Sequence, residues 1–428
     1  MKGKWKESLG LLEPLLLKNE ELSDREYEKI VLVEQLFFCG QLLDLKNINE
    51  ILSSFGIKSS NWYSLLKTLD LRKVKDLTEL SLEHLILSQL ETIYSKSTST
   101  QSRSEVCLII DDSVFRQWIK DTKYFDTLYF KQYSGQYGKA VYGFGVNTLG
   151  ISISGVFYPI YFEVLKNNEK SNRIYSAIRL LKRWSKFVTR SSFLKEHLPK
   201  IYLSVDSGYD HKELIRYCSS NNIHLICVIK KNNCIEINGD TYKVKQYIEE
   251  VFIKEEKVFY ENPKNKNKLF TKRLKVRYIS KNEIVILLFF RLKGSKKVSV
   301  VYSTNLSIFT KTLRRMWFNR TKIEQFFKLL KHTFEWSKAR TQSVIDFVKK
   351  LYFNFVTAAF VNQFVSNMKK VLSRYDKKYL KIGFDRLRRL IAKENSEYSI
   401  RAVLKWLIFR PFASVCDCNK FIINCLSL

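Results

Sequence analysis

The chain has few glycines and prolines and no long run of apolar residues. Its 428 residues include only 14 Gly and 5 Pro, so we expect few loop-rich linkers and no low-complexity segment. No uninterrupted apolar run reaches the roughly eighteen residues that a membrane-spanning helix needs. The N-terminus is not followed by the apolar core of a signal peptide. We therefore expect neither membrane insertion nor secretion.

Paired metal-binding motifs are also missing. The eight cysteines include no C-x2-C pair and the five histidines are scattered, so a structural zinc site has little support. Without a secretory signal, we expect reduced and mostly buried thiols. Cys416 and Cys418 lie two positions apart, which leaves a reactive or metal-binding pair as an alternative.

Positive charge is abundant. Lysine and arginine number 74 against 42 acidic residues, for a formal net charge of +32. This excess favours a polyanionic partner, with nucleic acid as the first candidate and an anionic membrane surface as the second. The composition, 45% hydrophobic and 14% aromatic, excludes a mainly disordered protein.

The first part of the chain has the pattern of a helical domain that ends at a polar linker. Helical segments are expected near residues 24–43, 47–54, 60–68 and 81–94. The stretch 95–104 is polar and lacks aromatic residues and periodicity, which is typical of a linker. We therefore predict a domain at residues 1–95.

Residues 47–67 have the pattern of a helix-turn-helix, with Gly56 at the turn. The second helix would then direct Asn61, Ser64 and Lys67 outward, where they are candidates for DNA recognition. A helical hairpin that only packs is the alternative.

The stretch after the linker predicts an α/β core. Residues 105–113 form an apolar run that ends in two carboxylates, as a buried central strand would. Two further strands, joined by a tight turn around Gly150, complete an antiparallel meander. The expected elements are strands at 137–148, 152–164, 200–206 and 223–229, and helices at 171–190 and 210–221.

This order of elements is that of the ribonuclease H-like α/β fold, with a mixed sheet. Asp112 and Asp206, at the ends of two strands, would meet at one sheet edge. We predict the first part of this core at residues 105–230, a mostly β insertion at 231–312 and the last part of the core at 313–345. The last strands of the insertion are able to rejoin the main sheet. The region 346–428 is predicted to be helical and basic.

The stretch 314–331 has no interior Gly or Pro and is predicted to be one helix. Helical spacing gives it two faces. The core-facing stripe consists of Met316, Ile323, Phe327, Leu330 and Phe334, and the adjacent face of Trp317, Arg320, Glu324 and Lys331. From the residues alone, the adjacent face is an ordinary solvated lattice of salt bridges.

The spacing Trp317-x2-Arg320-x3-Glu324-x6-Lys331 resembles the Y-x2-R-x3-E-x6-K signature of DDE transposases of bacterial insertion sequences, in the group numbered four. Trp317 stands where that family has a tyrosine. Asp112, followed by a serine, is similar to the family's strand-end Asp-Thr, and the stretch from Asp206 to Asp210 is similar to its second acidic motif. Asp111 remains as an alternative to Asp112, and Asp210 as an alternative to Asp206. Asp210 lies one helical turn beyond the strand and is expected to cap a helix.

This resemblance implies a catalytic triad of Asp112, Asp206 and Glu324. The three carboxylates would hold two Mg²⁺ ions, with Mn²⁺ able to substitute. The resemblance further implies that Trp317, Arg320, Lys328 and Lys331 contact DNA phosphates.

The implied activity is that of a transposase. It would bind double-stranded DNA at the ends of its element, hydrolyse the 3′ phosphodiester and use the freed 3′-OH to attack target DNA. We expect a homodimer on DNA, no membrane partner and a cytoplasmic, nucleoid-associated location. The alternatives are a related metal-dependent nuclease without strand transfer and a catalytically silent DNA-binding protein derived from a transposase.

Overall fold

The computed structural model describes residues 21–42, 66–95, 106–115, 125–134, 138–167, 172–198, 201–254, 259–261, 268–292, 295, 297–333 and 343–375. Most of the expected helix-turn-helix, with Asn61 and Ser64, lies outside these ranges. So do Phe334, Cys416, Cys418 and most of the predicted C-terminal region. Those predictions stay as they are.

A mixed sheet forms the centre of the fold. Its middle strands follow the order β4-β3-β1-β5-β6. Strand β1 pairs antiparallel with β3 and parallel with β5, and β6 continues the parallel part. This arrangement is consistent with a ribonuclease H-like fold. The bounds are β1 (Val106–Phe115), β3 (Lys139–Ile153), β4 (Val156–Val164), β5 (Ile201–Val205) and β6 (Ile223–Val228).

The turn between β3 and β4 corrects the prediction of a turn around Gly150. Strand β3 continues to Ile153, and the turn is made by Ser154 and Gly155, which both have positive φ. Gly150 lies inside the strand, beside a register irregularity in the β3–β4 ladder. A Cβ atom at Gly150 would stand 2.1 Å from Phe157 Cζ, so glycine is present there because of close packing.

The sheet extends well beyond β6. Strand β12 (Ser299–Ser303) pairs antiparallel with β6, followed by β11 (Glu283–Leu292) and β10 (Lys268–Tyr278). In the described part of the chain the sheet has twelve strands. The remaining elements are α6 (Phe125–Leu128), β2 (Tyr129–Ser134), β7 (Cys234–Ile237), β8 (Asp240–Lys243), β9 (Phe259–Glu261), α10 (Val244–Tyr247) and the π-helical turn η3 (Ile248–Phe252).

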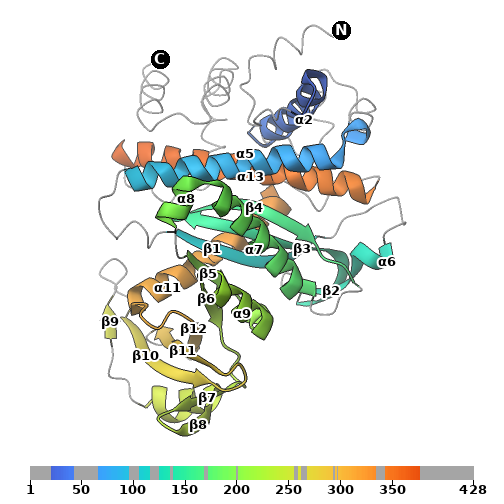
Figure 1. Cartoon of the computed structure of the whole chain (residues 1–428). Coiled ribbons are helices and arrows are strands. Elements are labelled where there is room, and N and C mark those ends of the chain that lie inside the picture. The colour runs from blue at the N-terminus through green and yellow to red at the C-terminus, as the bar shows by residue number, and fades with distance from the viewer. Residues whose placement is uncertain are drawn as a thin grey trace.

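The stretch predicted as a β insertion is therefore mainly β, and its later strands continue the main sheet. Figure 1 shows β7, β8 and β10 at the end of the molecule farthest from α5 (Leu71–Ser95) and α13 (Val344–Tyr375). That this stretch is an insertion into a smaller core, and the domain boundaries as a whole, stay predictions.

Helices cover both faces of the central strands. Asp111 and Asp112 are neighbours in β1, so their side chains leave opposite faces of the sheet. Asp112 contacts α7 (Asn172–Arg190), whereas Asp111 contacts Arg320, between α11 (Thr310–Asn319) and α12 (Thr321–Lys328). Helix α7 thus covers one face, and α11 and α12 cover the other. Helices α8 (Ser192–His197) and α9 (Lys212–Ser220) pack against α7.

Helices α5 and α13 lie side by side, and both pack on β4 (Figure 1). The Lys349 ammonium of α13 donates to the Leu66 carbonyl at 2.8 Å, which fixes the chain just before α5. Helix α5 begins ten residues before the predicted 81–94 segment. Helix α2 (Asp24–Leu42) also contacts α13. In the described part of the chain, no helix has the length and apolar character to span a membrane.

Candidate active site

The predicted helix at 314–331 is divided in the structure. Helix α11 ends at Asn319, α12 begins at Thr321, and the π-helical turn η4 (Leu329–Thr333) follows. The Arg320 amide donates to the Trp317 carbonyl, and the Ile323 amide to the Arg320 carbonyl, both at 3.1 Å. These i→i+3 bonds tighten the turn at Arg320. The apolar stripe is confirmed for its four described members, Met316, Ile323, Phe327 and Leu330, which are buried.

Arg320 joins two carboxylates. Its guanidinium donates to Asp111 Oδ2 at 3.0 Å and to Glu324 Oε1 at 2.6 Å. It also stacks on Trp317, with 5.0 Å between the guanidinium carbon and the ring centroid. The predicted cluster of Trp317, Arg320 and Glu324 is therefore present, and the strand acid nearest to it is Asp111.

Asp112 lies on the other face of β1 and is held by Arg173. Arg173 Nε lies 2.8 Å from Asp112 Oδ1, and its Nη2 donates to Oδ2 at 2.9 Å. This two-point geometry is the strong form of an arginine–carboxylate contact. Arg173 is the second residue of α7, so the start of that helix sets the position of the Asp112 carboxylate.

Tyr209 and Asn147 complete the surroundings of Asp112. The Tyr209 hydroxyl lies 3.1 Å from Asp112 Oδ1 and 2.9 Å from Asn147 Oδ1, and its single proton serves one of them at a time. Asn147 is the partner of Asp112 in the β1–β3 ladder, and its Nδ2 donates to the Arg173 carbonyl at 3.1 Å. Residues of β3, α7 and the loop after β5 thus hold the Asp112 side chain in place.

Asp206 follows β5 and begins the short 3-10 helix η2 (Ser207–Tyr209). Its Oδ1 accepts a hydrogen bond from the Gly208 amide at 2.7 Å. A Cβ at Gly208 would stand 2.4 Å from Arg173 Nη1, so the absence of a side chain lets Arg173 approach the loop. Asp206 and Asp112 therefore have the same guanidinium as a neighbour.

The acids affect one another electrostatically. Burial, with the charges of Asp112 and Asp206, raises the pKa of Asp111 to about 8, and Arg320 opposes this shift. Burial also raises the pKa of Asp112; Arg173 opposes the rise and Asp206 adds to it. Desolvated like charges of this kind are found where proteins bind cations or carry out acid–base chemistry.

The other predicted cations lie at different distances from these acids. Lys331, in η4, has its ammonium 5.2 Å from the centroid of Phe115, the last residue of β1. Burial lowers the pKa of Lys331 to about 8 and the charge of Asp112 opposes the shift, so the two are within electrostatic range. Lys328 is exposed in the last turn of α12. Lys67 is exposed and lies just before α5, outside the segments that carry the acids.

The described residues contain no group of three His, Cys, Asp or Glu side chains close enough to hold a metal ion. Glu324 contacts Arg320 and Asp112 contacts Arg173, and the convergence of Asp112, Asp206 and Glu324 on a metal stays a prediction. The chemistry of the acids nevertheless fits a hard divalent cation. Carboxylate oxygens are the ligands Mg²⁺ prefers. Added positive charge would relieve the repulsion that, together with burial, raises the pKa of Asp111.

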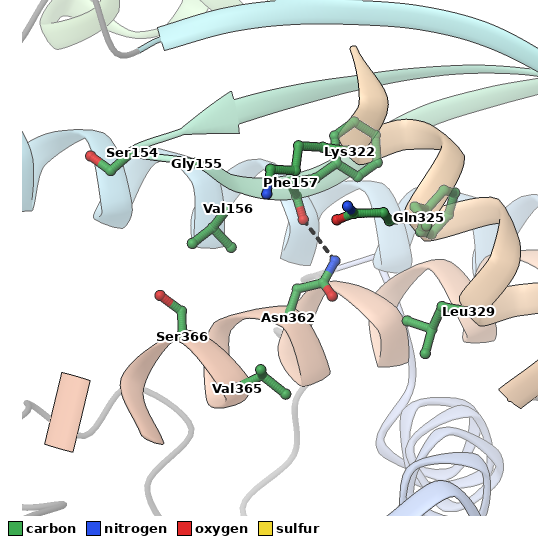
Figure 2. A pocket seen from close by; sticks show the side chains of 11 residues that line it. Ser154, Gly155, Val156, Phe157, Lys322, Gln325, Leu329, Asn362, Val365 and Ser366 are labelled. Carbon is green, nitrogen blue, oxygen red and sulfur yellow. Dashed lines mark hydrogen bonds between the residues drawn. The ribbon is translucent and has the colours of Figure 1, made fainter. Parts of the chain in front are cut away.

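A cavity of about 330 Å³ lies on the other side of α12 (Figure 2). Lys322, Gln325 and Leu329 line it from α12 and η4, and Asn362 lines it from α13, where its amide donates to the Phe157 carbonyl at 2.9 Å. Helical spacing places Lys322 opposite Glu324 and turns Gln325 about 100° away from it around the helix. The cavity is therefore separate from the acidic site.

Sequence reasoning missed Arg173, Asn147 and Tyr209. Arg173 was one cation among many in a basic amphipathic helix. Asn147 had no motif, and its only available signal was its place opposite Asp112 in an expected hairpin. Tyr209 lies within the acidic motif from Asp206 to Asp210, where an aromatic hydroxyl between two acids was the available signal.

Comparison with known proteins bears on the second half of this site. Residues 175–360 match the family model described as the transposase DDE domain. This span is less than half of the chain and includes Asp206, Arg320, Glu324 and Lys331. The match supports a transposase or nuclease role. No curated protein matches the chain in sequence.

One solved structure with some similarity is Ciona intestinalis endonuclease V in complex with a 23mer DNA that contains an inosine followed by a ribo-adenosine. Identity is 12%, and the alignment covers 64% of this chain and 95% of that chain, with a TM-score of 0.26. At this TM-score the folds superpose poorly, and the likeness supports no inference about the reaction.

Proposed function

We propose that the chain is a DDE transposase of a bacterial insertion sequence, in the group with the Y-x2-R-x3-E-x6-K signature. It would cut the ends of its element by hydrolysis and join the 3′-OH ends to target DNA. The observation that carries the proposal is the DDE-domain match at residues 175–360. The net charge of +32 fits a DNA partner.

The proposed catalytic acids are Asp112, Asp206 and Glu324. Burial raises the pKa of Asp112 and the charge of Asp206 adds to the rise, which supports placing these two acids at one site. Asp111 is the alternative to Asp112, because Arg320 connects Asp111 to Glu324. Substitution of each strand acid by itself separates the two assignments.

Asp112, Asp206 and Glu324 would hold two Mg²⁺ ions, with Mn²⁺ able to substitute, and metal bound there would supply water activation and charge stabilisation at the leaving oxygen. Arg173 and Tyr209 orient Asp112, and the Gly208 amide orients Asp206. Glu324 contacts Arg320 Nη2 through Oε1 alone, so release of this contact would make Nη2 available to a DNA phosphate while Nη1 stays with Asp111.

The remaining cations on this helix face align the DNA backbone. Lys331 and Arg320 would each contact a phosphate near the cut, Trp317 supports Arg320 by stacking, and Lys328 extends the positive face toward solvent. We also propose that the protein binds element ends and target as double-stranded DNA, acts as a homodimer on DNA and works in the cytoplasm at the nucleoid. Residues 1–95 would bind the element ends.

A cleavage assay on the duplex that flanks the coding sequence, with and without Mg²⁺, tests the proposal. Asp112→Asn, Asp206→Asn and Glu324→Gln should each abolish cleavage and leave DNA binding unchanged or tighter, because a negative charge beside the phosphates is removed. Glu249→Gln is the control. Glu249 is exposed in η3, so its substitution removes the same charge at a position away from the site.

The alternatives give different results in this assay. Mg²⁺-dependent cleavage without joined products would identify a nuclease without strand transfer. Binding without cleavage by the wild-type protein at any Mg²⁺ or Mn²⁺ concentration would identify a silent DNA-binding protein. Loss of activity in Asp111→Asn but not in Asp112→Asn would move the first ligand to Asp111.

A further inference from the structure

The loop between β5 and α9 carries two acids in different surroundings. Asp206 faces Arg173 and Asp112, as described above. Asp210 closes η2, and its side chain is only 2% exposed. The sequence suggested that Asp210 caps the following helix. That expectation is wrong, because His211 caps α9 through its ring nitrogen and the Asp210 carboxylate points to strands farther along the sheet.

All the side-chain partners of Asp210 in the described residues come from beyond β6. Tyr278, the last residue of β10, donates to Oδ2 at 2.5 Å, and Tyr302 of β12 donates to Oδ1 at 3.1 Å. The Asn233 amide, just before β7, donates to Oδ2 at 3.3 Å. Both tyrosines stay protonated donors, since burial raises their pKa.

Lys281 adds a charged contact from the turn between β10 and β11. Its ammonium donates to the Asp210 carbonyl at 2.9 Å and lies 3.7 Å from Oδ1. Both the side chain and the backbone of Asp210 are therefore held. A buried carboxylate with this many donors is costly to move, because any new position leaves charge or hydroxyl groups without hydrogen bonds.

The loop is too short to move independently at its two ends. Asp206 and Asp210 are four residues apart, and the Tyr209 amide donates to the Asp206 carbonyl at 3.1 Å. Cys227 of β6 also contacts this carbonyl, with 3.1 Å between sulfur and oxygen. The Tyr209 hydroxyl then reaches Asp112. A displacement of Asp210 would thus be passed to both Asp206 and Tyr209.

We propose that Asp210, held by Tyr278, Lys281, Tyr302 and Asn233, is a positioning residue that sets where Asp206 and Tyr209 stand relative to Asp112. The strands beyond β6 thereby determine the geometry of an acid that lies before them in the chain. This inference rests on the proposed function of Asp206. Asp210 itself touches neither DNA nor metal.

The test compares Asp210→Asn, Tyr278→Phe and Lys281→Met with wild type in the full-length protein. Each variant should lower the rate of Mg²⁺-dependent cleavage at saturating DNA by roughly ten- to a hundredfold, the loss that follows from a small misplacement of a reacting group. The dissociation constant for the DNA duplex should change by less than about threefold. Mn²⁺ binding to the DNA-free protein, measured by calorimetry, should also weaken.

The cluster of Glu83, Tyr161 and Arg190 provides a matched control. Glu83 is a mostly buried carboxylate that accepts from the Tyr161 hydroxyl and from Arg190, whose Nη2 lies 2.9 Å from Oε2. It joins α5, β4 and α7 away from the acids. Glu83→Gln and Tyr161→Phe should lower the melting temperature as the Asp210 variants do, without changing the cleavage rate or Mn²⁺ binding.

The outcomes separate this inference from the proposed function. If wild type cleaves and Asp210→Asn and Tyr278→Phe cleave as fast, with Mn²⁺ affinity unchanged, Asp210 only stabilises the fold and the inference is overturned. Equal rate losses in the Asp210 and Glu83 sets overturn it as well. If wild type does not cleave, the proposed function fails, and unchanged Mn²⁺ binding in the Asp210 variants then also rejects the positioning role. Tyr278→Phe keeps the test decisive if Asp210→Asn fails to fold.

Discussion

Arg173 meets the carboxylate of Asp112 with two nitrogens, at 2.8 and 2.9 Å. The contact joins the first turn of α7 to the middle of β1. It supplies positive charge to an acid whose neighbours are other acids. In this structure Arg173 therefore compensates the charge of Asp112, as a bound cation would.

Arg173→Gln should make the protein depend more on a divalent cation. Asp112 loses its counter-charge, so the melting temperature without metal should fall, and added Mg²⁺ should raise it by more than in wild type. Arg179→Gln is the control, because Arg179 lies in the same helix, contacts Glu163 at 2.7 Å and is nearly as exposed as Arg173. An equal Mg²⁺ effect in both variants and wild type would show that Arg173 does not compete with a cation.

Arg320→Ala and Lys331→Ala should slow cleavage by roughly ten- to a hundredfold and reduce the salt slope of DNA binding by only about one. The charge of these two residues would align the DNA backbone for cleavage, since many other lysines supply the affinity for DNA. Lys322→Ala is the control, because Lys322 lies on the opposite side of α12, at the cavity. Wholesale loss of binding with unchanged turnover at saturating DNA would make this face a docking surface.

The metal-free protein should lose stability as the pH rises from about 4 to about 8. The pKa of Asp111 is raised from 3.8 to about 8, so in this window the folded chain holds a proton that the unfolded chain has released, and the free energy of unfolding falls. Lys331, whose pKa is lowered to about 8, acts in the other direction, and only above this window.

Asp111→Asn should flatten this pH dependence, with a difference from wild type of at most about 1.4 kcal/mol per pH unit. Denaturant unfolding at several pH values measures it. Asp76→Asn, which removes an exposed acid of α5, should leave the slope as in wild type. A wild-type slope in Asp111→Asn would show that Asp111 titrates near its ordinary value.

Gly150→Ala should destabilise the protein by roughly 2–4 kcal/mol, which is more than Gly155→Ala. The new Cβ would meet Phe157 Cζ at 2.1 Å and the Tyr158 carbonyl oxygen at 2.8 Å, and backbone cannot move aside cheaply. A Cβ at Gly155 would meet no atom within 4 Å. Only the positive φ of +81° disfavours alanine there, so the substitution should cost about 1–2 kcal/mol. Equal losses would show that Phe157 and its strand relax around the methyl group.

The sequence predicted the elements that depend on local pattern. Continuous apolar residues with two acids at their end identified β1, and helical spacing identified α7, α9 and the buried stripe around Ile323. The structure places their bounds within a few residues of expectation. These features depend on burial and periodicity, which each segment carries in itself.

Contacts between distant segments could not be predicted in this way. Asp210 looked like a helix cap because its local sequence permits one, whereas its main partners lie 68 and 92 residues later. Arg320 was expected to face Glu324, and does, but its second partner Asp111 is 209 residues earlier. The turn was placed at Gly150 because glycine favours turns, yet packing against Phe157 gives it another reason to be glycine.

The packing of α5 against α13 has a consequence for how the chain is made. Helix α5 leaves the ribosome early, but the helix that covers it ends at residue 375. Throughout synthesis of the sheet, the buried side of α5, with Val74, Leu77 and Leu85, lacks that partner. A nascent chain of this kind exposes apolar surface until late, so it is a natural client for chaperones, and products truncated before residue 344 should aggregate.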